Sequence, residues 1–204
     1  MSRRVGAIFL KYRGRNKMID QKTKEELWQA CIFFHGHSCP GLAVGFAAAI
    51  YASELMGIDL RPEGRSQIAD EEIVIIAEND ACGVDAIQRI LSATVGKGNL
   101  LFHITGKSAY SFYKRKTGES FRLVLKPYER DMSRSEKEEY LLTTPGKDLF
   151  EVKETTTPIP SKAKVFHSYI CESCHEKTGE HWMRIQDGKK VCLDCFEKYR
   201  TLEI

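Results

Sequence analysis

The 204-residue sequence lacks the features that mark several common protein classes. No apolar run approaches the roughly twenty residues of a membrane-spanning helix, so we expect no membrane protein. The first residues lack the basic start, apolar middle and small-residue cleavage site of an export signal, and we expect a cytoplasmic protein. Internal repeats and low-complexity tracts are absent, and the 42% hydrophobic content is that of a folded chain.

Nucleotide-binding glycine motifs are also absent. Gly96-Lys-Gly98 is a lone glycine pair without the spacing of a P-loop or a dinucleotide fingerprint, and we predict no nucleotide cofactor. The seven cysteines leave an odd remainder of three outside the tail pattern described below. This count argues against a disulfide framework and for a reducing compartment.

Acidic residues are missing from the first nineteen positions, where six basic side chains give a charge of +6, while the whole chain carries +3. Everything from residue 20 onward therefore sums to −3. A basic end can be a nucleic-acid arm, but a solvated extension is the commoner role. We interpret residues 1–19 as a basic extension.

Four cysteines near the C-terminus form two Cys-x-x-Cys pairs separated by seventeen residues: Cys171, Cys174, Cys192 and Cys195. Four thiolates at this spacing can close a tetrahedron around Zn²⁺ and leave no position open for a substrate. We therefore predict a structural zinc finger over residues 165–204. A knuckle, a hairpin turning at residues 187–188 and a helix starting near Cys195 would follow one another as in a treble clef.

The remainder of the chain predicts an α+β core domain over residues 20–153. Capping boxes, glycine stops and helical spacing of apolar residues predict helices over residues 23–34, 40–57, 84–91 and 133–142. Buried strands are expected at residues 73–77 and 100–104, and a hairpin at residues 109–116 and 119–126. The sheet would be mixed or antiparallel, packed with helices. Residues 154–164, with three threonines and two prolines, are predicted to be a linker.

Two imidazoles and one thiol lie within five positions of the turn between the first two predicted helices. Pro40 suits the first helical position, so Cys39 would lie at a helix N-terminus, where free N–H groups and the dipole favour a thiolate. His35 and His37 are close enough to share a metal with this sulfur or to act as its base.

Cys82 lies between a predicted strand and helix, where it could meet Cys39. We predict that four side chains form a candidate site for zinc or another transition metal: His35, His37, Cys39 and Cys82. Asp80 or Asp85 would support these ligands through hydrogen bonds. The alternative is that these side chains only pack, which is the interpretation we favour for Cys31.

These motifs resemble the family named for the E subunit of formylmethanofuran dehydrogenase. The resemblance covers most of residues 20–130 and rests on His35-Gly-His37-Ser-Cys39-Pro-Gly-Leu42, Cys82-x-x-Asp85-Ala-Ile-Gln88, Gly96-Lys-Gly-Asn-Leu100 and Gly106-Lys107. It implies an α+β core domain, a homodimer and a metal or ligand pocket around His37, Cys39 and Cys82. Many members carry a cysteine at the position of Ala93, so a family-type site here would rely on His35, His37 or water, or bind no metal.

The leading interpretation is a zinc-binding accessory or regulatory protein, with zinc in the finger, a second transition metal in the core and no assigned reaction. One alternative is a metal- or thiol-dependent small-molecule enzyme that uses Cys39 as nucleophile or ligand and His37 as base. Another is a protein- or nucleic-acid-binding module acting through the finger. Residues 165–204 carry six basic and seven acidic side chains, and four thiolates around Zn²⁺ bring the charge to about −3. Phosphate affinity needs the opposite sign, so we expect no nucleic-acid partner.

Overall fold

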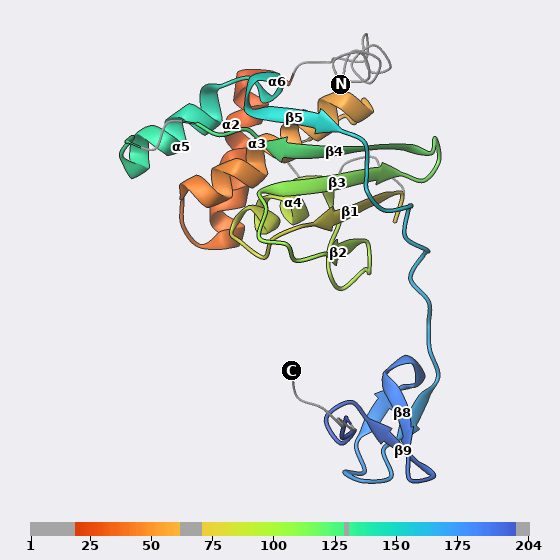
Figure 1. The fold of residues 1–204 in the computed structure, drawn as a ribbon. Helices are drawn as coiled ribbons and strands as arrows, with labels where there is room; N and C mark the ends of the chain where they lie inside the picture. The colour runs from red at the N-terminus through yellow and green to blue at the C-terminus, as the bar shows by residue number, and fades with distance from the viewer. Residues whose placement is uncertain (1–18, 62–70, 129–130, 199–204) are drawn as a thin grey trace. The chain divides into compact units, whose positions relative to one another are not determined.

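The computed structural model describes residues 19–61, 71–128 and 131–198, which divide into two compact units between Lys162 and Ala163. The described residues of the first unit form five helices and a five-stranded sheet (Figure 1). The second contains two short hairpins. Most of the predicted basic extension, residues 1–18, lies outside the described residues. No helix in the described parts of the chain is both long and apolar enough to cross a bilayer.

Helices α2 (Gln21–His35) and α3 (Pro40–Met56) begin and end at the residues that local chemistry favours. The capping box predicted to begin the first helix at Thr23 was wrong, because Asp20 caps α2 instead and its side chain accepts a hydrogen bond from the Thr23 N–H. Gly36 ends the helix with a left-handed φ of 94°. Proline opens α3 and Gly57 ends it. Fourteen residues of α3 are buried, which makes it the central helix of the core, as its apolar run and small residues predict.

The sheet is mixed, with strand order β2-β1-β3-β4-β5, and the predicted α+β class is confirmed. Strands β1 (Ile73–Ala77) and β2 (Leu100–Phe102) run parallel and are connected through α4 (Gly83–Leu91). Antiparallel pairing joins β1 to β3 (Ala109–Lys114), β3 to β4 (Glu119–Leu125) and β4 to β5 (Phe150–Lys153).

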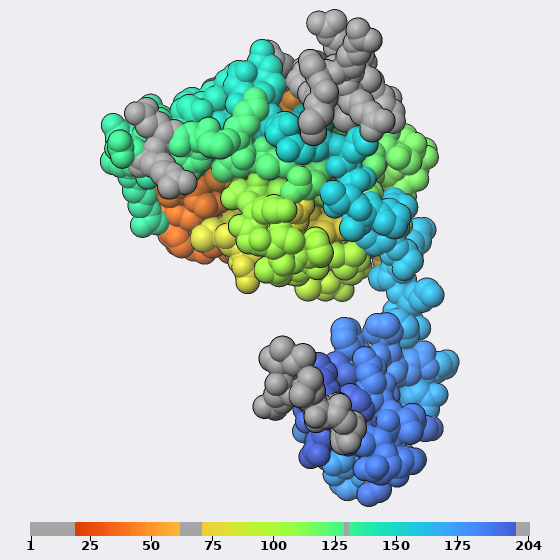
Figure 2. Space-filling view, in the orientation of Figure 1, coloured from red at the N-terminus to blue at the C-terminus, as the bar shows by residue number. Residues whose placement is uncertain are grey.

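Two further helices, α5 (Arg134–Thr143) and α6 (Gly146–Leu149), precede β5. The predicted capping box of α5 is present, since Ser133 and Glu136 each accept a hydrogen bond from the other's backbone N–H. Strand β5 and helix α6 were not predicted, because four residues give too little periodicity to recognise either element. In the space-filling view, α5 (teal) lies against the orange part of the chain, which comprises α2 and α3 (Figure 2).

The two faces of β1 belong to different apolar clusters. Ile73, Ile75 and Ala77 join the main core with α3, whereas Val74 and Ile76 pack with Tyr113 on the opposite face. The beginning of the linker is held to the sheet, because the hydroxyl of Tyr113 donates to the carbonyl of Thr157 at 2.9 Å and Arg115 donates to the carbonyl of Pro160 at 2.8 Å. The segment predicted as a linker is therefore docked over its first half.

A close crossing of two helix backbones joins α3 to α4. A Cβ atom added to Gly45 would lie 1.9 Å from the carbonyl oxygen of Gly83, far inside any real contact. Glycine at position 45 is therefore required for this crossing, which brings the N-terminal ends of α3 and α4 together.

The C-terminal unit consists of two antiparallel strand pairs. One pair is β6 (Ser168–Ile170) with β7 (Lys177–Gly179), and the other, after the short helix η1 (Glu180–Trp182), is β8 (Met183–Gln186) with β9 (Lys189–Cys192). The predicted hairpin turn at residues 187–188 is present. The predicted helix does not begin within residues 195–198, and residues 199–204 lie outside the described part of the chain.

Candidate metal centre

The turn between α2 and α3 gathers the predicted donor atoms. One nitrogen of His35, one of His37 and the sulfur of Cys39 all lie within 4.8 Å of one another. The two imidazole rings are 4.6 Å apart between centroids. Zinc bound at about 2.0–2.1 Å from nitrogen and 2.3 Å from sulfur requires its ligand atoms roughly 3.3–3.8 Å apart, so modest side-chain rotations would complete the site.

Two local features fix this turn. Left-handed Gly36 reverses the chain after His35, and Cys39 is the N-cap of α3, where its sulfur accepts a hydrogen bond from the Leu42 N–H at 3.3 Å. The prediction that Cys39 lies at a helix N-terminus is therefore confirmed. An amide donor and the N-terminal end of a helix both stabilise negative charge on the sulfur.

His35 is held by a carboxylate on one side and has no partner on the other. Its Nδ1 lies 2.7 Å from Oδ2 of Asp85 in α4. Its Nε2 is buried and has no hydrogen-bond partner among the described residues. Asp85 accepts a hydrogen bond and therefore favours the tautomer with the proton on Nδ1, which leaves a lone pair on Nε2. Of the two acids predicted to support the site, Asp85 contacts a candidate ligand, whereas Asp80 is exposed.

Cys82 is the N-cap of α4 and lies beside Cys39. A Cβ atom added to Gly41 would be 3.6 Å from the sulfur of Cys82 and 3.8 Å from that of Cys39. Burial, followed by the hydrogen bond and charge of Cys39, raises the pKa of Cys82. The predicted meeting of these two thiols is observed, although Cys82 is not part of the three-residue donor group.

Ala93, at whose position many family members carry a cysteine, lies far from Cys82. Ala93 is fully buried beyond the C-terminal end of α4, while Cys82 caps its N-terminal end. A nine-residue helix is about 13 Å long, so a cysteine at position 93 could not share a metal with Cys82.

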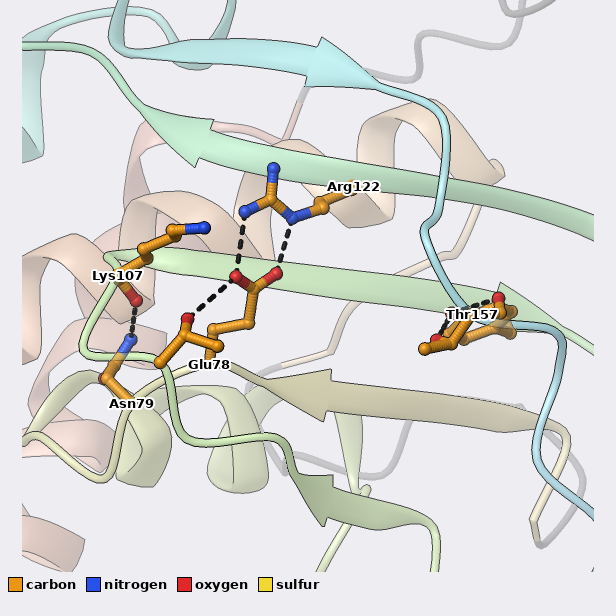
Figure 3. Close-up of polar contacts among 7 residues, drawn as sticks. Glu78, Asn79, Lys107, Arg122 and Thr157 are labelled. Carbon is orange, nitrogen blue, oxygen red and sulfur yellow. Dashed lines mark hydrogen bonds and ion pairs between the residues drawn. The ribbon is translucent and has the colours of Figure 1, made fainter.

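A buried ion pair anchors the loop that carries Cys82. Glu78 follows β1 directly, and its carboxylate accepts hydrogen bonds from Nε and Nη2 of Arg122 in β4 and from the hydroxyl of Thr105 (Figure 3). The bonds from Arg122 hold the pKa of Glu78 below its ordinary value. The side-chain amide of Asn79 donates to the carbonyl of Lys107 at 2.8 Å.

Sequence reasoning missed this pair. An acid that directly follows five aliphatic strand residues signals burial, and a buried carboxylate needs a cation. Which basic residue supplies this cation depends on which strands are neighbours in the sheet, and the sequence alone does not reveal that order.

The aromatic residues before His35 are exposed. Phe34 follows Leu27 and Cys31 at the spacing of one helical face, which would predict that it is buried as they are, but 53% of Phe34 is exposed and so is 91% of Phe33. Cys31 is fully buried, and burial raises its pKa to about 12. The last turn of α2 therefore extends beyond the surface on which the helix packs.

A groove with about 800 Å³ of free space lies between α2, α5 and the turn. The groove is lined by Trp28, Phe46, charged residues of both helices and Ser38. Ser38 lies in the sequence directly between His37 and Cys39. A molecule in this groove would lie next to the candidate site.

In the C-terminal unit, the four cysteine sulfurs all lie within 4.8 Å of one another: those of Cys171, Cys174, Cys192 and Cys195. The sulfurs of Cys174 and Cys192 are 3.8 Å apart, the spacing that two zinc–sulfur bonds of 2.3 Å at a tetrahedral angle give. Backbone N–H groups of Cys174 and Cys192 lower the pKa of Cys171 to about 6. These atoms are arranged for a closed tetrahedral site.

Two family models match different parts of the chain. The model described as FmdE, molybdenum formylmethanofuran dehydrogenase operon, matches residues 34–157. The model described as prokaryotic dksA/traR C4-type zinc finger matches residues 166–200. With the clustered sulfurs, the second match identifies the C-terminal unit as a four-cysteine zinc finger.

Two individual proteins are similar to most of the chain. A solved structure of a tungsten formylmethanofuran dehydrogenase FmdE-like protein from Syntrophus aciditrophicus is similar in fold, with a TM-score of 0.58, 24% identity, and 84% of this chain and 91% of that chain covered. A probable S-adenosyl-L-methionine-binding protein from Archaeoglobus fulgidus is 25% identical over 195 residues. That alignment covers 81% of this chain and 51% of the relative, so the chain spans about half the length of the curated relative it matches.

Proposed function

Since the chain belongs to the FmdE family, whose model matches more than half of its residues, we propose that it is an accessory or regulatory protein with a second transition metal in its core domain. His35, His37 and Cys39 would hold this metal, in addition to the zinc of the finger. We further propose that the protein acts in the cytoplasm.

The unpartnered Nε2 of His35 carries the proposal. A buried ring nitrogen without a hydrogen bond is costly, and a metal ion at this position would satisfy it. Asp85 on the other ring nitrogen orients the imidazole and makes Nε2 more basic, as carboxylates do for many metal-bound histidines. The nitrogen and sulfur donor set fits zinc or another borderline transition metal.

The three donors leave a coordination position for a small ligand. A metal with an open position supplies Lewis-acid chemistry. The protein's own residues define its surroundings: Asp85 fixes the tautomer of His35, the Leu42 N–H stabilises the charge on Cys39, and Ser38 connects the site to the groove.

Metal counting on the purified full chain tests the proposal. We expect two zinc ions per chain in the wild type and one in His37→Ala, because the finger keeps its metal. His103→Ala is the matched control, since this histidine is also exposed but lies outside the donor group, and it should retain two. One zinc in the wild type, or two in His37→Ala, would contradict the proposal.

Spectroscopy distinguishes the two sites. With Co²⁺ in place of zinc, the core site has one thiolate ligand and the finger four. We expect His37→Ala to remove only the weaker sulfur-to-cobalt charge-transfer band. Loss of both bands would mean that the variant is unfolded rather than unable to bind metal.

A second candidate is a small-molecule enzyme in which Cys39 or its metal acts on a ligand bound in the groove. The groove favours it, because Ser38 lines this space directly beside His37 and Cys39. The name of the Archaeoglobus relative makes S-adenosyl-L-methionine the first probe. Calorimetric titration with S-adenosyl-L-methionine should detect binding to the wild type and no binding to a Trp28→Ala variant. If the wild type also gives no heat of binding, this candidate function is contradicted.

We also propose that the protein is a homodimer and that Phe33, the most exposed aromatic side chain of the described core unit, is covered in it. Light scattering should give twice the chain mass, about 47 kDa from 23.3 kDa per chain. Phe33→Ser should give the monomer mass, and a monomeric wild type would contradict the proposal. We propose in addition that a protein partner binds the finger through two of its exposed apolar side chains, Trp182 and Ile185.

A further inference from the structure

We infer that Cys39 and Cys82 form a reversible disulfide, which makes the occupancy of the core site sensitive to oxidation. The inference rests on the proposed function for its effect on the metal, but the thiol pair itself is independent of any metal. In the metal-bound state Cys39 is a ligand. In the oxidised state its sulfur is bonded to Cys82 and is no longer available.

The fold brings the two cysteines together from positions 43 residues apart in the sequence. Each occupies the N-cap position of a helix, Cys39 on α3, where its sulfur accepts a capping hydrogen bond, and Cys82 on α4, where it makes none. The close crossing at Gly45 and Gly83 fixes these helices against each other. Both sulfurs therefore lie at a place that the backbone holds rigidly.

The available space fits a sulfur–sulfur bond. Both sulfurs lie within 3.8 Å of the position that a Cβ atom on residue 41 would occupy, and this residue is a glycine, so it places no side chain there. A disulfide has its sulfurs about 2.05 Å apart, a distance that rotation of the two side chains can supply without moving either helix.

The remaining cysteine of the core unit, Cys31, differs from this pair in its exposure to solvent. Cys31 is fully buried on α2 within the apolar core, whereas Cys82 is half-buried and the neighbouring residues 80 and 81 are exposed. Cys39 itself keeps 5% exposure, so an oxidant in solution reaches the pair from the side of Cys82, whereas Cys31 has no exposed surface.

Hydrogen peroxide is the oxidant for which the reaction is written. The sulfur of Cys39, stabilised as an anion by the Leu42 N–H and the end of α3, attacks one peroxide oxygen and becomes a sulfenic acid, with release of hydroxide. The sulfur of Cys82 then displaces the hydroxyl group, which leaves as water. In total, two thiols lose two electrons and two protons, and one peroxide becomes two waters. A zinc ion remains Zn²⁺ throughout and leaves because it has lost its thiolate ligand.

Peptide mapping without reduction tests the inference on the full chain. Trypsin places Cys39, with Cys31, in the peptide of residues 25–65 and Cys82 in the peptide of residues 66–89. After treatment with hydrogen peroxide we expect these peptides to be cross-linked, with a mass two hydrogens below their sum, and to separate again on reduction with dithiothreitol. Cys39→Ser and Cys82→Ser should each abolish the cross-link, whereas Cys31→Ser should keep it.

Trapping and rate measurements sharpen the test. In Cys82→Ser, dimedone should label Cys39, because its sulfenic acid has no resolving thiol. In His37→Ala, where the proposed core metal cannot shield Cys39, the cross-link should form at least about tenfold faster than in the zinc-loaded wild type. Folding of each variant is checked by circular dichroism.

The outcomes separate the two proposals. Absence of the cross-link from folded wild type treated with peroxide, or a cross-link that survives Cys82→Ser, overturns the disulfide whether or not the core binds metal. A cross-link that forms equally fast in the wild type and in His37→Ala supports the disulfide but counts against metal at the core site. Cross-linking together with release of one of two zinc ions supports both.

Discussion

Removal of one partner of the ion pair between Glu78 and Arg122 is expected to destabilise the core unit strongly. The side chains retain only 6% and 10% exposure, and two hydrogen bonds of 2.5 and 2.8 Å join them. Arg122→Met removes the cation and leaves the carboxylate buried without its partner. Breaking a buried pair in this way costs about 3–5 kcal/mol.

Urea denaturation followed by tryptophan fluorescence measures this loss. The chain has two tryptophans, and in a Trp182→Phe background only Trp28 remains, which is buried against Phe46 in the core unit. With a urea dependence of about 2 kcal/mol per molar, the midpoint of Arg122→Met should fall by about 2 M. The double variant with Glu78→Leu should regain most of this difference, because it no longer buries an unpaired charge.

The dependence on pH follows from the same contacts. Pairing holds the pKa of Glu78 below its ordinary value of 4.5, so the pair stabilises the fold fully above about pH 4.5 and loses its effect as the pH falls through the folded-state pKa. In Arg122→Met the carboxyl is protonated more readily, and the deficit should shrink between about pH 7 and about pH 5. A deficit below about 1 kcal/mol at pH 7, or one that grows toward pH 5, would refute the reasoning.

Three further predictions concern the helix crossing, the site and a cap. Gly45→Ala should destabilise the core unit by about 3 kcal/mol in the same urea assay, because its methyl group meets the backbone of α4, while Gly96→Ala, in open space, should change stability by less than about 0.5 kcal/mol; equal effects would contradict the described crossing. Asp85→Asn should weaken metal binding at the core site about 10–100-fold in a competition titration with a chelating dye and leave the finger's metal unchanged, whereas unchanged affinity would mean that Asp85 does not orient His35. Ser133→Ala should lower stability by about 1 kcal/mol through loss of the α5 cap, and no measurable loss would show that the cap is dispensable.

Local chemistry explains why much of the fold could be predicted from the sequence. The ends of α2 and α3 follow from Gly36, Pro40 and Gly57, and the cap of α5 from its Ser133 and Glu136. Each of these signals acts within a few residues. The four-cysteine pattern is equally local, since each pair occupies one tight turn.

Contacts between distant segments could not be predicted in the same way. His35 and Asp85 are 50 residues apart, and Glu78 and Arg122 are 44 apart, so their pairing depends on the helix crossing and on the strand order. Phe34 shows the limit of periodicity, because the spacing that buries Cys31 continues past the end of the packing surface. Sequence reasoning could name the donors at the turn but not the residues that hold them.

A crystal structure with anomalous diffraction data at the zinc edge would show directly whether the core unit binds a metal ion. We expect two metal peaks per chain. One should lie among the sulfurs of the finger, and the other about 2.0–2.3 Å from Nε2 of His35 and from donor atoms of His37 and Cys39. A single peak in the finger, with Nε2 of His35 hydrogen-bonded to protein or water, would contradict it.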